Sequence, residues 1–209
     1  MRLSTRAGLW VIFSACLMLA DGSQAVQFHQ VQDAAAARHV AMLANQGDAI
    51  AQNRLGEMYA SGWNVQRDSA QAVVWFRKSA EQGNAEGEYN LGVMYKTGQG
   101  VPQDYTQAII WIRQAAAQRH ALALNNLGWM YAHGEGVPHQ RVVAYALYSI
   151  AAGTDAVGGT YAVKNRQALM RTMGKGEVAA AQRLVLEMQV PGNLLKAMDH
   201  YLAAQLPLP

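Results

Sequence analysis

The sequence predicts an all-α fold, a right-handed α/α superhelix, or solenoid, of stacked helix-turn-helix units. Three observations predict it. The 209 residues are 51% hydrophobic, which is enough for a sizeable core. A glycine recurs every 36 residues, at Gly56, Gly92 and Gly128. Each period also holds two apolar stretches of helical periodicity with a glycine-containing turn between them. Because one such hairpin cannot bury its own apolar faces, successive units must stack.

Several residue types keep the same period and define the repeat. The shared positions are Leu55, Leu91 and Leu127; Met58-Tyr59, Met94-Tyr95 and Met130-Tyr131; Gly62, Gly98 and Gly134; and Ala72, Ala108 and Ala144. We predict three 36-residue repeats over residues 48–155. The first helices are expected at 48–60, 84–96 and 120–132, and the second helices at 69–82, 105–118 and 141–152.

The glycine within each first helix needs an explanation, since glycine costs about 1 kcal/mol relative to alanine in a helix. Its recurrence predicts a close approach of the second helix, opposite the small residues Ala72, Ala108 and Ala144.

Polar residues at the expected helix starts predict the helix caps. Asp68 and Asp104, each followed three residues later by Gln, predict capping boxes on the second helices. The third unit has Gln140 at this position, so its box is lost. His120 begins a first helix where the other units carry Asp or Asn, and we expect it to cap that helix.

Helical segments flank the repeats. We expect a leading helix within residues 26–47, at 34–44, and capping helices with a tail within 156–209. The C-terminal helices are predicted at 160–172, after Gly158-Gly159, and then at 176–189 and 193–204. The last helix either covers the final repeat, which we favour, or binds a partner.

One stretch of the second unit carries a family resemblance. Ala85 to Tyr95, continued by Gly98-Gln99-Gly100-Val101-Pro102-Gln103-Asp104, resembles the Sel-one-like repeat (SLR) family, a relative of tetratricopeptide repeats. The resemblance covers the three units and implies the same solenoid. In tetratricopeptide-like solenoids the first helices line a concave surface that holds extended peptides.

The first 25 residues are typical of an export signal. Arg2 and Arg6 precede the apolar stretch Gly8 to Ala20, which is too short to span a bilayer. Ser23 and Ala25 place small residues at the cleavage-recognition positions. We predict cleavage near Ala25 and a periplasmic or secreted protein.

Cys16 allows a second interpretation of this segment. Ser14-Ala15-Cys16 resembles the end of a lipoprotein cleavage box, in which the cysteine becomes a lipid anchor. Phe13 stands where leucine is usual, and cleavage there would leave an apolar stretch directly after the lipid. We favour the form without lipid.

Composition and motifs exclude several functions. The net charge is +3, but Lys and Arg are scattered, so nucleic acid is not expected as a partner. The sequence has no nucleotide-binding loop, and its single cysteine lies within the predicted signal. His133, Glu135 and His139 share one turn, but we interpret them as a solvated turn and not as a metal site. We expect no catalytic residue and no cofactor.

The informative positions lie on the first helices, where the repeat leaves the residue type free. The candidate partner-binding residues are Asn53, Arg54, Glu57, Tyr89, Asn90, Val93, Asn125, Asn126, Trp129 and His133. The resemblance implies that Arg54, Asn90 and Asn126 contact peptide backbone. Tyr89 fits binding or packing between repeats equally well, whereas Trp129 favours binding.

These observations predict an exported, non-catalytic adaptor that binds a protein or peptide on the concave face of the solenoid. The alternative is a cell-envelope enzyme or enzyme modulator that acts on cell-wall or β-lactam-type substrates. Some cysteine-rich secreted relatives are linked to β-lactam binding, but their paired cysteines are absent from this sequence.

Overall fold

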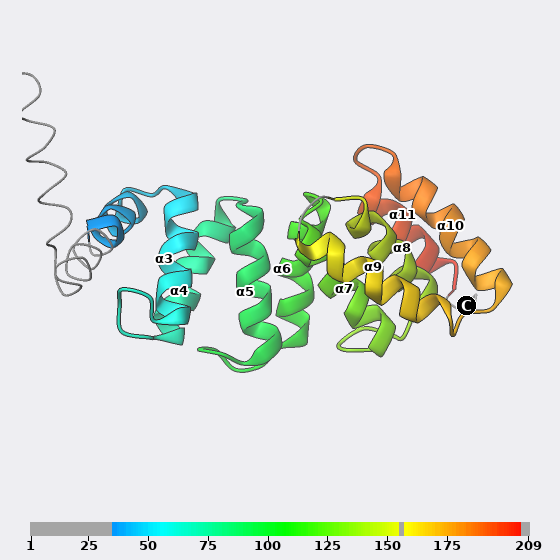
Figure 1. The fold of residues 1–209 in the computed structure, drawn as a ribbon, viewed down its shortest axis with the longest axis horizontal. Helices are drawn as coiled ribbons and strands as arrows, with labels where there is room; N and C mark the ends of the chain where they lie inside the picture. Colours follow the sequence, from blue (N-terminus) through cyan, green and yellow to red (C-terminus); the bar gives the residue numbers. More distant parts are fainter. Residues whose placement is uncertain (1–34, 155–156, 206–209) are drawn as a thin grey trace, which may run out of the picture.

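The computed structural model describes residues 35–154 and 157–205, and helices linked by short turns make up this part of the chain. The helices are one at 35–45, α3 (Ala49–Ser61), α4 (Ser69–Glu81), α5 (Ala85–Thr97), α6 (Tyr105–Ala117), α7 (Ala121–His133), α8 (Arg141–Ala152), α9 (Val157–Met170), α10 (Lys175–Gln189) and α11 (Leu194–Ala203). They form an elongated array in chain order (Figure 1).

The three units are helical hairpins, α3 with α4, α5 with α6 and α7 with α8, and each second helix also packs against the next first helix. This confirms the predicted solenoid of 36-residue repeats. The repeat helices begin and end within one residue of the predicted positions. The predicted signal at 1–25 and Cys16 lie outside the described residues.

The first helices share one way of beginning and ending. Each N-cap side chain accepts a hydrogen bond from the backbone N–H three residues later, at 2.7 Å for Asp48, 2.9 Å for Asn84 and 3.2 Å for His120. The expected cap at His120 is therefore confirmed. Each of these helices ends at a glycine with positive φ, such as Gly98 at 70°.

The second helices are capped more simply than predicted. Asp68 accepts hydrogen bonds from the N–H groups of Ala70 and Gln71, and Asp104 accepts one from Gln107. The reciprocal bond from the glutamine side chain, which completes a capping box, is not formed in the described part of the chain. Gln140 makes no side-chain cap, as expected.

The recurring glycines are sites of close packing, as predicted: a Cβ on Gly92 or Gly128 would lie 3.2 or 3.3 Å from the backbone oxygen of Ala108 or Ala144, and a larger side chain lies closer still. A Cβ on Gly56, Gly92 or Gly128 would lie 2.6 to 2.8 Å from the side chains of Phe76, Ile112 or Tyr148. These neighbours stand one helical turn after the conserved-register alanines, which are themselves fully buried. Each large side chain therefore packs directly on the backbone of the first helix, in the space that a missing side chain leaves.

The C-terminal helices cover the last unit. α9 packs against α7 and α8, α10 against α8, and α11 against α10 and α6. The predicted start at 160 is wrong, because α9 begins at Val157 and includes both glycines. A Cβ on Gly158 would lie 2.5 Å from the backbone N of Leu122, so glycine lets α9 approach α7 closely. α11 buries Leu194 and Met198, and its Asp199 pairs with Arg113 of α6 at 2.7 Å.

Within the described ranges, none of the helices combines the length and the apolar character that crossing a membrane requires.

Replacing Gly92 with leucine should lower the free energy of unfolding by about 1 to 3 kcal/mol, because its Cβ would lie 2.6 Å from Ile112 and 3.2 Å from two backbone atoms. Urea denaturation measures the change. Gly176→Leu is the matched control, since a Cβ at that position of α10 has no neighbour within 4 Å. Equal stability of the two variants would contradict the packing role of Gly92.

Candidate partner-binding face

The predicted face is joined between the first two units by side-chain amides. Asn90 on α5 donates through Nδ2 to Oδ1 of Asn53 on α3 at 2.9 Å. Asn53, which is buried, donates in turn to Oε1 of Glu57 at 2.8 Å. The Nδ2 of Asn90 also lies 3.5 Å from Glu57 Oε1. The first and second units are thus bonded through three of the predicted residues.

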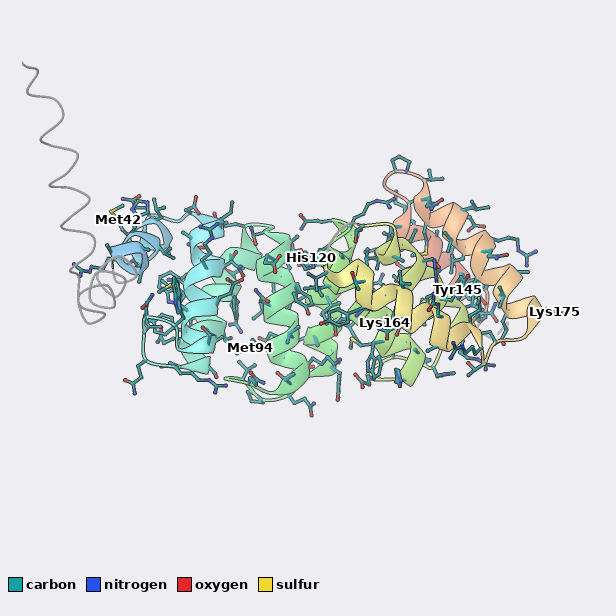
Figure 2. The ribbon with its side chains drawn as sticks, viewed as in Figure 1. Met42, Met94, His120, Tyr145, Lys164 and Lys175 are labelled. Carbon is teal, nitrogen blue, oxygen red and sulfur yellow. The ribbon has the colours of Figure 1, made fainter. Side chains whose placement is uncertain are left out.

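The second and third units are joined in the same way. Asn126 on α7 donates to the hydroxyl of Tyr89 on α5 at 2.9 Å. The Tyr89 ring lies 5.0 Å from the ring of His120, which Figure 2 labels, and His120 also bonds Glu86 at 2.9 Å. Tyr89 is half-buried against the core, so it packs between repeats.

A third bridge continues the series. Asn165 on α9 donates to Oδ1 of Asn125 on α7 at 2.9 Å. In the described part of the chain, no hydrogen bond joins α4 to α6 or α6 to α8, but a second helix also bonds the next first helix: Arg77 on α4 donates to the hydroxyl of Tyr95 on α5 at 2.6 Å.

Arg54 and Glu57 lie at the N-terminal end of this face. Both are exposed and line a pocket of about 480 Å³ with Val40, Met58 and Trp63. Val93 lies farther along the face and is half-buried.

Trp129 is exposed and yet held in place. Its side chain is 38% accessible, and its Nε1 donates to Oε1 of Glu135 at 3.2 Å. The other carboxylate oxygen of Glu135 pairs with Lys96 of the preceding unit at 3.2 Å. The ring of His133 stacks on the indole at 3.7 Å, and its Nδ1–H donates to the Trp129 carbonyl. The hydrogen bond to Glu135 and the stacked ring of His133 therefore hold the indole in one orientation.

A pocket of about 240 Å³ opens beside this ring pair. It lies between α7, α8 and α9 and is lined by Trp129, Ala132, His133, Tyr148, Asn165, Ala168, Leu169 and Thr172.

Sequence reasoning missed three residues of this region: Glu135, Tyr148 and Asn165. The sequence does mark Tyr148 as unusual, because the other units carry Phe76 and Ile112 at its position and only the third unit adds a hydroxyl. The sequence does not mark Glu135 or Asn165, since Glu135 lies in a variable turn and Asn165 lies outside the repeats. In the described ranges no His, Cys, Asp and Glu side chains cluster so that three could hold a metal ion, and this includes His133, Glu135 and His139.

Two neighbouring carboxylates on α5 titrate in opposite directions. The hydrogen bond from His120 lowers the pKa of Glu86. Burial raises the pKa of Glu88, which is only 4% exposed, although a hydrogen bond from Gln118 at 2.9 Å offsets part of this effect. In the first unit, uncharged Gln52 stands at the position of Glu88 and accepts the corresponding bond from Gln82.

Comparison with known proteins shows which repeat this is. The Sel1 repeat family model matches residues 49–84, 85–120 and 121–152. Among curated proteins there is no significant match.

Two solved structures have the same fold. One is c5321, a protective antigen present in uropathogenic Escherichia coli strains and displaying an SLR fold; it is 29% identical with a TM-score of 0.69, and the match covers 83% of this chain and 36% of that protein. The other is a Sel1 repeat protein from Oxalobacter formigenes, 31% identical with a TM-score of 0.55, over 61% of this chain and 51% of that protein. The chain therefore matches only about a third and a half of their lengths.

Glu88→Gln should raise the melting temperature at neutral pH, because it removes a charge whose burial opposes folding. The folded chain holds the Glu88 proton more tightly than the unfolded chain does, so the advantage should shrink as the pH falls below the raised pKa. Calorimetry over a pH series measures both effects.

Glu86→Gln is the matched control with the opposite sign. The lowered pKa of Glu86 means that its ionised form stabilises the fold above about pH 4, and that this contribution is lost as the pH falls further. Its loss should therefore lower the melting temperature at neutral pH. If both variants change stability in the same direction at neutral pH, the assignment of the two environments is wrong.

Proposed function

The chain belongs to the Sel1 repeat family, and from this premise we propose that it is an exported, non-catalytic adaptor that binds a protein or peptide along its first helices. Sel1 repeats commonly form protein-interaction scaffolds, and solenoids of this family are generally non-catalytic. The export, the adaptor role and the position of the binding face are our proposals.

The observation that carries the proposal is the exposed indole of Trp129. Tryptophan is normally well buried, and it is enriched at the centres of protein interfaces. Glu135 and His133 hold this side chain in one position, so binding would cost little side-chain entropy. A rigid aromatic side chain beside a pocket is well suited to anchor a partner.

The amide bridges support the same face. Asn90 donates to two neighbouring oxygens, and Asn126 donates to Tyr89 and to the Leu122 carbonyl at 3.2 Å. Both N–H groups of each amide are thus engaged. Their carbonyl oxygens have no hydrogen-bond partner in the described part of the chain, and these oxygens would accept bonds from the N–H groups of an extended peptide.

Arg54 adds an exposed cation from the first helix of the first unit. Its side chain lines the N-terminal pocket together with Glu57, at the opposite end of the face from Trp129. A partner that contacts both ends would extend across all three units.

Trp129→Ala should weaken partner capture by about 30-fold or more, because truncation of a central aromatic anchor typically costs about 2 kcal/mol or more. Quantitative crosslinking to envelope proteins, followed by affinity measurement with the captured partner, provides the test.

Ile110→Ala is the control for this prediction, since Ile110 is 43% exposed on the second helix α6. It should leave capture unchanged, and circular dichroism melts should show both variants folded. The proposal fails if the Ile110 variant loses the partner while the Trp129 variant retains it.

A reporter fused to residues 1–30 should be exported and cleaved near Ala25 without acquiring lipid. Mass spectrometry of the processed amino terminus measures this outcome. Incorporation of labelled palmitate that is lost in Cys16→Ser would instead favour the lipoprotein form.

A further inference from the structure

We propose that the pocket beside Trp129, together with the cations on α9 and in the turn directly after it, selects an acidic peptide segment and receives one of its Asp or Glu carboxylates. This inference rests on the proposed function, and it adds the charge of the partner and the place where that charge is bound.

The hydroxyl of Tyr148 is the first observation that points to a ligand. Tyr148 lines the pocket and is only 1% exposed, and its hydroxyl has no hydrogen-bond partner among the described residues. Among the described residues, this hydroxyl is not one of the fully buried polar atoms that lack a partner, so it opens onto the pocket. Packing does not require it, because Phe76 and Ile112 serve at the same position. An acceptor on a ligand would satisfy it.

The available donors suit a carboxylate. Burial raises the pKa of Tyr148, so the hydroxyl keeps its proton and can donate. Asn165 uses one N–H of its amide to bond Asn125 and retains the second. Hydrogen bonds from such donors to a charged acceptor are stronger than bonds to a neutral one.

The size and walls of the pocket suit a single side chain. Its volume of about 240 Å³ is below the roughly 300 to 1,000 Å³ that is usual for pockets that enclose a small molecule. Trp129, Ala132 and Leu169 provide apolar surface, which fits the methylene groups that carry a carboxylate.

The charge around the pocket favours an anion. Between residues 157 and 175 the chain carries Lys164, Arg166, Arg171 and Lys175 and no acidic residue. Lys164, which Figure 2 labels, and Arg171 are exposed, and they stand four residues before and three residues after Ala168 of the pocket wall. The nearby carboxylate of Glu135 is paired with Lys96. The charges of this stretch next to the pocket are therefore all positive, which favours an anionic ligand.

The experiment selects peptides from a phage-displayed random library on the purified chain. We expect the selected sequences to be enriched in Asp and Glu. Each selected peptide is then synthesised twice, once as selected and once with Asn and Gln in place of the acids, and fluorescence anisotropy gives the affinity of both.

Tyr148→Phe should weaken binding of the acidic peptide by about tenfold or more and binding of the amide version by less, because a hydrogen bond to a charged acceptor is stronger than one to a neutral amide oxygen. Tyr145→Phe is the matched control, since it removes a hydroxyl of α8 that does not line the pocket. The double variant Lys164→Gln, Arg171→Gln should lower the affinity for the acidic peptide and make that affinity less dependent on salt. The control variant Arg183→Gln, Lys196→Gln removes the same charge from α10 and α11, and it should leave the affinity and its salt dependence unchanged.

The outcomes separate this inference from the proposed function. If peptides are selected and lose affinity in Trp129→Ala, but neutral or basic sequences bind as well as acidic ones, the acidic subsite is overturned and the peptide-binding face remains. Equal binding of the acidic peptide to the Tyr148 and Tyr145 variants also overturns it. If no peptide is selected, or selected peptides bind independently of Trp129, the proposed face fails and the subsite with it. Thermal melts confirm that each variant is folded.

Discussion

The structure depends on one contact, in which the large side chain of a second helix packs directly on the backbone of its first helix at a glycine. This contact brings each pair of helices together at a fixed separation. Because the same contact recurs in all three units, the hairpins are nearly identical building blocks and stack in one register. The amide bridges require this regularity: residues 37 positions apart, such as Asn53 and Asn90, meet at 2.9 Å. The candidate binding face is therefore a product of packing inside each unit.

The period of the sequence was sufficient to predict the fold. Helix limits followed from the recurring glycines and capping residues, since both act locally. The partner of each glycine could not be predicted in the same way. It depends on how far the second helix is shifted along the first. A shift of one helical turn changes which residue of the second helix contacts the glycine. Ala72 and Phe76 stand on the same face of α4, and only the three-dimensional register shows that Phe76 is the residue that contacts Gly56.

The residues of the candidate face could be predicted from the sequence, but the hydrogen bonds among them could not. A helix position at which the repeat leaves the residue type free can be predicted to face a partner, but the sequence does not show whether its side chain is already bonded to a neighbouring unit. Asn126 and Tyr89 are joined by stacking of units, which no local pattern encodes. Asn165 enters the site because α9 packs against α7 and α8, although the sequence of α9 has lost the repeat. Tyr148 was the exception, because a hydroxyl at an otherwise apolar register position is visible in the sequence.

The amide bridges along the first helices have a mechanical consequence. They join successive first helices by side-chain hydrogen bonds of 2.9 Å, between Asn53 and Asn90 and between Tyr89 and Asn126. Stretching the array along this row would break these bonds, whereas the second helices are not bonded to one another in the described part of the chain. When the solenoid bends, we therefore expect the spacing of the first helices to change less than the spacing of α4, α6 and α8.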